Sequence, residues 1–184
     1  LKIIRSLSCP VVWDADALNL LACHEDLLPL PGKDFVTPHP GEAARLLHCS
    51  VSSVTESSLQ ALETLPAKLG CNVLLKGART LMVSGNQKAI NVFSSPALAR
   101  GGSGDMLCGI LASCIIRVKD VPYRDLRVMQ CASLLHGLAA IRAGIQFGND
   151  SATPEDILAC FRMDADHLPY SCSLHESEYR HVKY

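Results

Sequence analysis

A glycine-rich segment, Gly101-Gly102-Ser103-Gly104-Asp105, lies directly before an apolar stretch, Met106 to Val118, that predicts a helix. Glycines leave the backbone free to curl, so the unpaired N–H groups and the positive dipole end of a helix start can bind an anion. Asp105 adds a carboxylate that can accept a proton beside this site. The segment, called the glycine loop below, predicts a kinase-like phosphate site. A glycine turn that only caps an ordinary helix is the alternative.

Three other polar loops follow predicted strands. The strands are Pro10 to Trp13, Phe35 to Thr37 and Cys71 to Leu75, and the loops are Asp14-Ala15-Asp16, Thr37 to Glu42 and Lys76-Gly77. Ligands of open α/β sheets bind where the carboxyl ends of parallel strands meet. We therefore expect these loops and the glycine loop to converge on one site.

Helical patterns alternate with these strands. Apolar spacing predicts helices over Ala17 to Ala22, Ala43 to Leu47, Ser57 to Leu69, Asp105 to Val118 and Leu126 to Ala143. A further helix opens at Thr153-Pro154-Glu155-Asp156, where Thr153 suits the N-cap and Asp156 can cap in return. Leu81 to Val83 predicts a hairpin partner, and Ala89 to Phe93 predicts a last strand. The alternation predicts an α/β fold with a mostly parallel sheet covered by helices on both faces.

The composition indicates a globular domain. The charges are nearly balanced, with 17 Lys+Arg against 18 Asp+Glu, and aromatic residues make up only 5%, so nothing favours nucleic acid as a partner. Nine cysteines form no CxxC pair, which argues against zinc and favours a reducing, cytoplasmic compartment. The longest apolar run is too short to cross a bilayer, so we expect no membrane association.

The domain organisation follows from the same patterns. One core is expected over residues 1–163, and the polar, aperiodic residues 164–184 are expected to form a weakly ordered extension. The chain starts without methionine, so it is interpreted as a piece of a longer protein.

Five motifs resemble those of NAD(P)H-hydrate dehydratases of the bacterial, ADP-dependent type. In order they are the segment Trp13 to Ala22, Thr37-Pro38-His39-Pro40-Gly41-Glu42, Leu75-Lys76-Gly77-Ala78, the glycine loop, and His136-Gly137-Leu138-Ala139. The resemblance runs from about Pro10 to Phe161. It implies a ribokinase-like three-layer fold and a carbon–oxygen lyase that restores NADH or NADPH from the hydrated forms NADHX and NADPHX. The hydroxyl on the hydrated ring would be phosphorylated and phosphate then eliminated.

The resemblance also implies roles for individual residues. It assigns the catalytic base to Asp105. It assigns substrate contacts to His39, Gly41, Glu42, Asp105, Asp16 and Asn19, and nucleotide contacts to Lys76, Gly77, Ala78, Arg79, Thr80, Gly102, Ser103 and Gly104. ADP or ATP would donate the phosphoryl group with Mg²⁺, and no protein metal ligand is assigned.

Simpler structural interpretations stay open for several of these residues. His39 could cap the following helix, and the segment from Lys76 to Thr80 could be an ordinary surface turn. Asp14 and Asp16 could bind substrate or magnesium, or Asp16 could cap the helix through Ala17, an uncertainty that Asn19 shares. His136 lies in an apolar helix, which favours a packed, hydrogen-bonded role over a catalytic one.

Two departures from the family pattern bear on activity. The family carries further β/α units before the aspartate-rich motif, so we expect part of the substrate site to be missing and an exposed sheet edge to pair with another chain as a homo-oligomer. Arg100 replaces the usual threonine before the glycine loop, where it would either add a phosphate contact or crowd the pocket. Another ribokinase-like small-molecule kinase and an inactive nucleotide-binding or interaction module are the alternatives.

Overall fold

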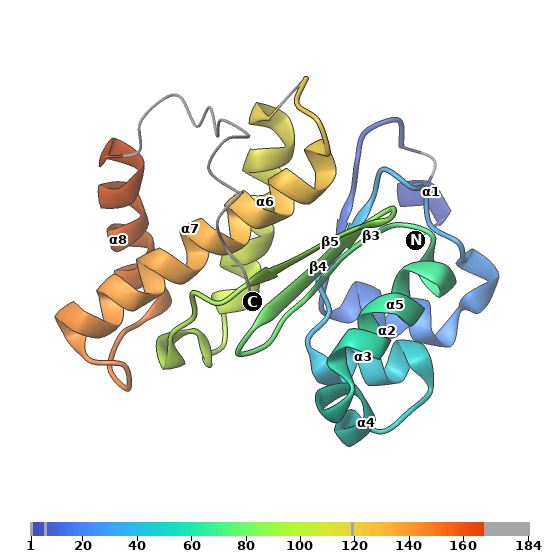
Figure 1. The fold of residues 1–184 in the computed structure, drawn as a ribbon, viewed down its shortest axis with the longest axis horizontal. Coiled ribbons are helices and arrows are strands. Elements are labelled where there is room, and N and C mark those ends of the chain that lie inside the picture. The colour runs from blue at the N-terminus through green and yellow to red at the C-terminus, as the bar shows by residue number, and fades with distance from the viewer. Residues whose placement is uncertain (1, 6, 119, 168–184) are drawn as a thin grey trace, which may run out of the picture.

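The computed structural model describes residues 2–5, 7–118 and 120–167. The chain forms an α/β fold in which a central sheet separates two groups of helices (Figure 1). The elements are α1 (Lys2–Arg5), β1 (Val12–Trp13), α2 (Asp16–Cys23), η1 (Glu25–Leu27), β2 (Phe35–Val36), α3 (Pro40–Leu47), α4 (Val51–Glu56), α5 (Ser58–Leu69), β3 (Asn72–Leu75), β4 (Thr80–Ser84), β5 (Gln87–Asn91), η2 (Pro96–Leu98), α6 (Ser103–Arg117), α7 (Arg124–Phe147) and α8 (Pro154–His167).

The sheet has five strands in the order β1-β2-β3-β4-β5. The β1–β2 and β2–β3 pairings are parallel, as expected, and helices connect these strands. The β3–β4 and β4–β5 pairings are antiparallel because short turns join these strands, so the sheet is mixed. The second of these turns contains Gly85, whose positive φ of 56° suits a tight hairpin.

Alternate strand residues face opposite helical layers. Val36, Val73 and Val83 pack with α2, α3 and α5 in one core, whereas Phe35, Leu74 and Met82 pack with α6 and α7 in the other. Figure 1 shows these two helical groups on opposite sides of the sheet. The three-layer arrangement predicted from the alternation of strands and helices is confirmed, and it places the carboxyl ends of β1, β2 and β3 at a common edge.

The helices differ from the sequence prediction at several points. Helix α6 begins at Ser103, before Asp105, and α4 was not predicted because its residues Val51–Glu56 are mostly polar. Helix α8 continues to His167, so residues 164–167, where the extension was expected to begin, are helical. The rest of that extension lies outside the described residues. The predicted cap is confirmed, because Thr153 Oγ1 accepts from the Asp156 backbone N–H and the Asp156 carboxylate accepts from Thr153.

Among the described residues, one helix has the length and mean hydropathy of a membrane span. That helix is α7, with a mean hydropathy of 1.3 over its most apolar window, half of which is buried inside the fold. It packs against α6, α8 and the strands β4 and β5. The core helix of a folded domain has the same pattern, and we assign α7 that role.

Candidate functional site

The four polar loops meet at the carboxyl ends of β1, β2 and β3. The Lys76 ammonium lies 2.7 Å from Oδ1 of Asp14 and 3.9 Å from Oε2 of Glu42. A Cβ atom added to Gly104 would lie 3.4 Å from the same Lys76 nitrogen and 3.5 Å from Oδ2 of Asp14. The convergence predicted from the sequence is therefore confirmed, and the glycine loop lies beside the ion pair.

Asp14 is bonded through both of its carboxylate oxygens, although the sequence left its role open. Its Oδ2 accepts from the Cys108 thiol at 3.2 Å, and the sulfur also lies 3.6 Å from the Thr37 hydroxyl. Burial opposes ionisation of Asp14, but the hydrogen bond and positive charge of Lys76, helped by the hydrogen bonds of Cys108 and Thr37, hold its pKa below the usual value. Asp14 is thus a carboxylate that neutralises Lys76.

The glycine loop forms the start of α6. Gly102 adopts φ 87°, in the left-handed region that favours glycine, and no side chain caps the helix. The Ser103 N–H donates to the Arg100 carbonyl at 3.4 Å, whereas no side chain caps the other N–H groups of the first turn. Asp105 is exposed in this turn, and no hydrogen bond or ion pair joins its carboxylate to another described residue. The loop therefore offers donors for an anion and a carboxylate able to accept a proton.

The buried side of the same turn is fixed by Ser103 and His136. Both residues are about 5% exposed, and Oγ of Ser103 lies 3.4 Å from Nε2 of His136. Burial and the charge of Lys76 lower the pKa of His136 to about 4, so the imidazole is neutral at physiological pH. The packed role predicted for His136 is confirmed. The Ser103 side chain faces the core, and its backbone N–H donates a long hydrogen bond of 3.4 Å to the Arg100 carbonyl.

His39 caps helix α3. Its Nδ1 accepts from the backbone N–H groups of Gly41 and Glu42 at 3.0 and 3.3 Å, and the Glu42 carboxylate accepts from the His39 backbone N–H at 2.8 Å. This reciprocal pair is a capping box, so the capping alternative for His39 is confirmed. Glu42 is buried, whereas half of the His39 side chain is exposed, which leaves the ring accessible to a ligand.

Asp16 and Asn19 lie on α2, outside the ion-pair cluster. The capping alternative for Asp16 is wrong: Asp16 is the first helical residue, and the N-cap is Ala15, which has no side-chain acceptor. Asn19 lies 3.5 Å from the Asp16 carboxylate and accepts from the Arg45 guanidinium at 2.7 Å. Asn19, Gly41 and Arg45 contribute to the lining of a cavity of about 510 Å³ between α2 and α3.

The rest of the predicted nucleotide segment forms the turn between β3 and β4. Gly77, Ala78 and Arg79 are exposed there, and Thr80 begins β4. Lys76 is the member that joins the ion-pair cluster, and its backbone N–H is bonded to the carbonyl of Pro38 at 2.8 Å. The segment is thus both a surface turn and the support of the cationic side chain.

Arg100, directly before the glycine loop, is hydrogen-bonded to another loop. Its guanidinium donates a hydrogen bond to the backbone carbonyl of Asp150, in the loop that precedes α8. Arg100 therefore connects the approach to α6 with the start of α8.

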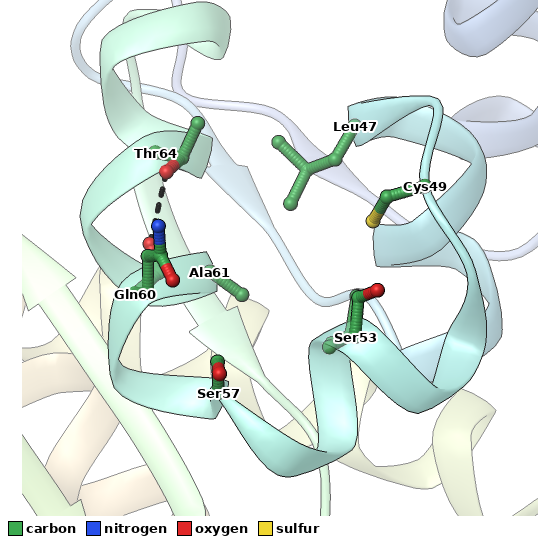
Figure 2. Close-up of a pocket in the computed structure, with 8 residues that line it drawn as sticks. Leu47, Cys49, Ser53, Ser57, Gln60, Ala61 and Thr64 are labelled. Carbon is green, nitrogen blue, oxygen red and sulfur yellow. Dashed lines mark hydrogen bonds between the residues drawn. The ribbon is translucent and has the colours of Figure 1, made fainter.

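A second cavity, of about 250 Å³, lies away from the ion pair, between α3, α4 and α5 (Figure 2). Its wall includes Leu47, Ser53, Gln60 and Thr64, and Thr64 bonds the backbone carbonyl of Gln60. The polar and charged residues of the candidate site lie instead at the carboxyl ends of β1, β2 and β3.

Within residues 2–5, 7–118 and 120–167, no group of three His, Cys, Asp or Glu side chains has the geometry of a metal site.

Comparison with known proteins places the chain in a family. A family profile described as NAD(P)H-hydrate dehydratase matches residues 1–161. The bifunctional NAD(P)H-hydrate repair enzyme of Vibrio cholerae is 35% identical over 86% of this chain and 31% of its own length. The ADP-dependent (S)-NAD(P)H-hydrate dehydratase of Neisseria meningitidis is 40% identical over 71% of this chain and 44% of its own length.

The fold is shared with solved structures. The ADP/ATP-dependent NAD(P)H-hydrate dehydratase of Bacillus subtilis, co-crystallised with ATP/Mg²⁺, superposes with a TM-score of 0.77 at 22% identity. That superposition covers 90% of this chain and 57% of the Bacillus chain. This chain therefore spans about a third of the bifunctional relative and less than two thirds of the other two proteins. Its ribokinase-like fold and its ordered motifs agree with the profile match, and the chain belongs to the NAD(P)H-hydrate dehydratase family.

Proposed function

We propose that this chain contributes the phosphoryl-transfer centre of a nucleotide-dependent NAD(P)H-hydrate dehydratase. The observation that carries the proposal is the meeting of three groups in a member of this family. They are the start of α6, which no side chain caps, the Lys76 ammonium beside Gly104, and the exposed carboxylate of Asp105. This combination suits the transfer of a phosphoryl group to a hydroxyl, because it supplies anion donors, a positive charge and a base.

Each group has a distinct task in the proposed reaction. Asp105 accepts the proton of the hydroxyl on the hydrated nicotinamide ring as that oxygen attacks the terminal phosphorus of the nucleotide. Backbone N–H groups of Gly102, Ser103 and Gly104 and the Lys76 ammonium stabilise the negative charge on the transferred phosphoryl oxygens. Elimination of phosphate from the ring then restores NADH or NADPH, and ADP leaves as AMP, or ATP as ADP.

The nucleotide and magnesium fit this chain to different degrees. The first turn of α6 and Lys76 fit a nucleotide phosphate, since they present donors and a cation without a competing side-chain cap. Asp14 is engaged by Lys76 and Cys108, so it is not a free magnesium ligand. Mg²⁺ is commonly held by substrate phosphates and water with one or two carboxylates, and exposed Asp105 is a side chain able to contribute.

The test is replacement of the proposed base. Asp105→Asn keeps the size of the side chain and removes its ability to accept a proton. We expect nucleotide-dependent recovery of NADH absorbance from hydrated NADH to fall at least about 100-fold, with ADP affinity within a few-fold of wild type. Asp26→Asn, at an exposed position of η1, is the matched control and should leave the rate unchanged. Equal rates for Asp105→Asn and wild type would remove the assigned role.

A small-molecule kinase of the same fold is the second candidate. The similarity to the hydroxyethylthiazole kinase of Pyrococcus horikoshii, with a TM-score of 0.62 at 15% identity, shows a shared fold. The two functions separate in one assay. Phosphorylation of a hydroxyethylthiazole or hydroxymethylpyrimidine without recovery of NADH would favour the kinase. Nucleotide binding that is retained with no activity altered by Asp105→Ala would favour an interaction module.

A further inference from the structure

Asp14 lies at the centre of contacts that come from four elements. Its carboxylate follows β1, and its partners are Lys76 after β3 and Cys108 on α6; Gly104, at the start of α6, lies beside it. Thr37, after β2, contacts the Cys108 sulfur. The Asp14 side chain is only 12% exposed, so the contacts to Lys76 and Cys108 restrict it on both carboxylate oxygens.

Lys76 lies between two carboxylates at unequal distances. The ammonium is 2.7 Å from Asp14 and 3.9 Å from Glu42, and Glu42 also accepts the backbone N–H of His39 in the cap of α3. Asp14 therefore holds the ammonium on the side of α6, and Glu42 is the alternative partner on the side of α3. If Asp14 lost its charge, the remaining carboxylate would draw Lys76 toward α3.

Because Gly104 has no side chain, the backbone at the start of α6 can lie close to the Asp14–Lys76 ion pair. The added Cβ would be in van der Waals contact with both the Lys76 nitrogen and the Asp14 oxygen. With glycine there, the backbone of the first turn of α6 lies next to the ammonium. The N–H groups and the cation are consequently placed to act on one anion.

We propose that Asp14 is a positioning residue that holds the Lys76 ammonium at the start of α6 for the phosphate groups of a nucleoside diphosphate. This inference rests on the proposed function, since it names the residue that orients the cation of that same site. Asp14 itself does not contact the nucleotide and acts through Lys76. Cys108 supports it by donating its thiol hydrogen to the second carboxylate oxygen. Burial and the neighbouring Asp14 charge raise the pKa of Cys108 to about 12, which keeps this thiol protonated despite the opposing hydrogen bond to Thr37.

A double-mutant cycle on ADP affinity tests this role. Wild type, Asp14→Asn, Lys76→Met and the double variant are titrated with ADP by calorimetry, and thermal unfolding confirms that each is folded. We expect Asp14→Asn and Lys76→Met each to weaken ADP binding about tenfold. The double variant should bind ADP within about twofold of Lys76→Met, because Asp14 has no function once the ammonium is gone. Adenosine, which lacks phosphate, should bind all four proteins equally.

Cys108→Ala is a second, milder variant that leaves both charges in place. It should weaken ADP binding a few-fold in the wild-type background and have no effect in the Lys76→Met background. Equal losses for Asp14→Asn in both backgrounds would show that Asp14 acts independently of Lys76 and would overturn the proposal. Unchanged ADP affinity in Asp14→Asn would also overturn it.

These outcomes are distinguishable from failure of the proposed function. ADP affinities that follow the cycle in a protein that restores no NADH would retain the positioning role and reject the dehydratase activity. Recovery of NADH, combined with additive losses of ADP affinity in the double variant, would retain the dehydratase activity and reject the positioning role of Asp14. Failure of wild type to bind ADP would reject both.

Discussion

The buried His136 makes the free energy of unfolding depend on pH, in part through the charge of Lys76. Burial and the Lys76 ammonium lower its pKa in the folded protein to about 4, whereas an unfolded histidine titrates near ~6.5. As the pH falls from about 6.5 to 4, the unfolded state takes up a proton that the folded state excludes. The free energy of unfolding therefore decreases across this window, by about 3 kcal/mol for the full shift.

This pH dependence is a prediction for His136→Gln, which keeps a polar side chain that does not titrate. Denaturant unfolding at several pH values should show a smaller loss of stability between pH 7 and pH 4.5 for this variant than for wild type. The lowered pKa of Asp14 affects both proteins equally and at lower pH, since its contribution is lost only as the pH falls below the ordinary aspartate value. Parallel pH profiles for the two proteins would contradict the assignment.

At this scale the sequence predicted the chemistry of the site better than its geometry. The glycine loop and Asp105 are at the expected helix start because glycine placement and an apolar run are local signals. The pairing of Asp14 with Lys76 joins residues 62 positions apart, and the packing of three strands creates it. Local spacing also left Asp16 as a candidate cap, although α2 already begins at Asp16 and its N-cap is Ala15.

At the scale of elements, Gly137 determines how closely α7 approaches the chain after β5. A Cβ added to Gly137 would lie 2.2 Å from the Phe93 carbonyl oxygen, which no side chain tolerates. Gly137→Ala should therefore destabilise the protein by about 1–3 kcal/mol through overpacking. Gly109→Ala is the matched control inside α6, because nothing lies within 4 Å of its added Cβ, and it should be neutral or stabilising by up to about 1 kcal/mol.

Denaturant unfolding of the two alanine variants measures this difference directly. Equal stability of Gly137→Ala and Gly109→Ala would show that α7 moves away from Phe93 at no cost. The motif that contains Gly137 would then have no packing role.

Strands and long amphipathic helices were predictable because their apolar residues have a clear period. Helix α4 was not predictable, because Val54 is its buried residue and the rest of its short sequence is mostly polar. Its N-cap is Ser50, whose hydroxyl accepts from the Ser53 backbone N–H. The last strand is displaced from the predicted Ala89 to Phe93, because the tight turn at Gly85 fixes the register of β5 at Gln87. The bounds of β5 are therefore set by its pairing with β4, which the apolar period of the sequence does not predict.

At the scale of the whole molecule, the two strands β1 and β5 are the outer strands of the sheet. Ile90 on β5 is 52% exposed, and Val92 and Phe93 directly after it are 63% and 48% exposed. Exposed apolar side chains at an outer strand favour association with another chain. The homo-oligomer expected from the sequence stays a prediction.

The central claim concerns what the chain does with hydrated NADH. The direct measurement is the stoichiometry of one reaction mixture that contains wild-type protein, hydrated NADH, ADP and Mg²⁺. NADH is followed by absorbance, and AMP and phosphate are quantified at the same times. The account predicts one AMP and one phosphate for each NADH restored, with no recovery when ADP or ATP is omitted. Recovery of NADH that is independent of nucleotide, or nucleotide consumption without NADH, would contradict it.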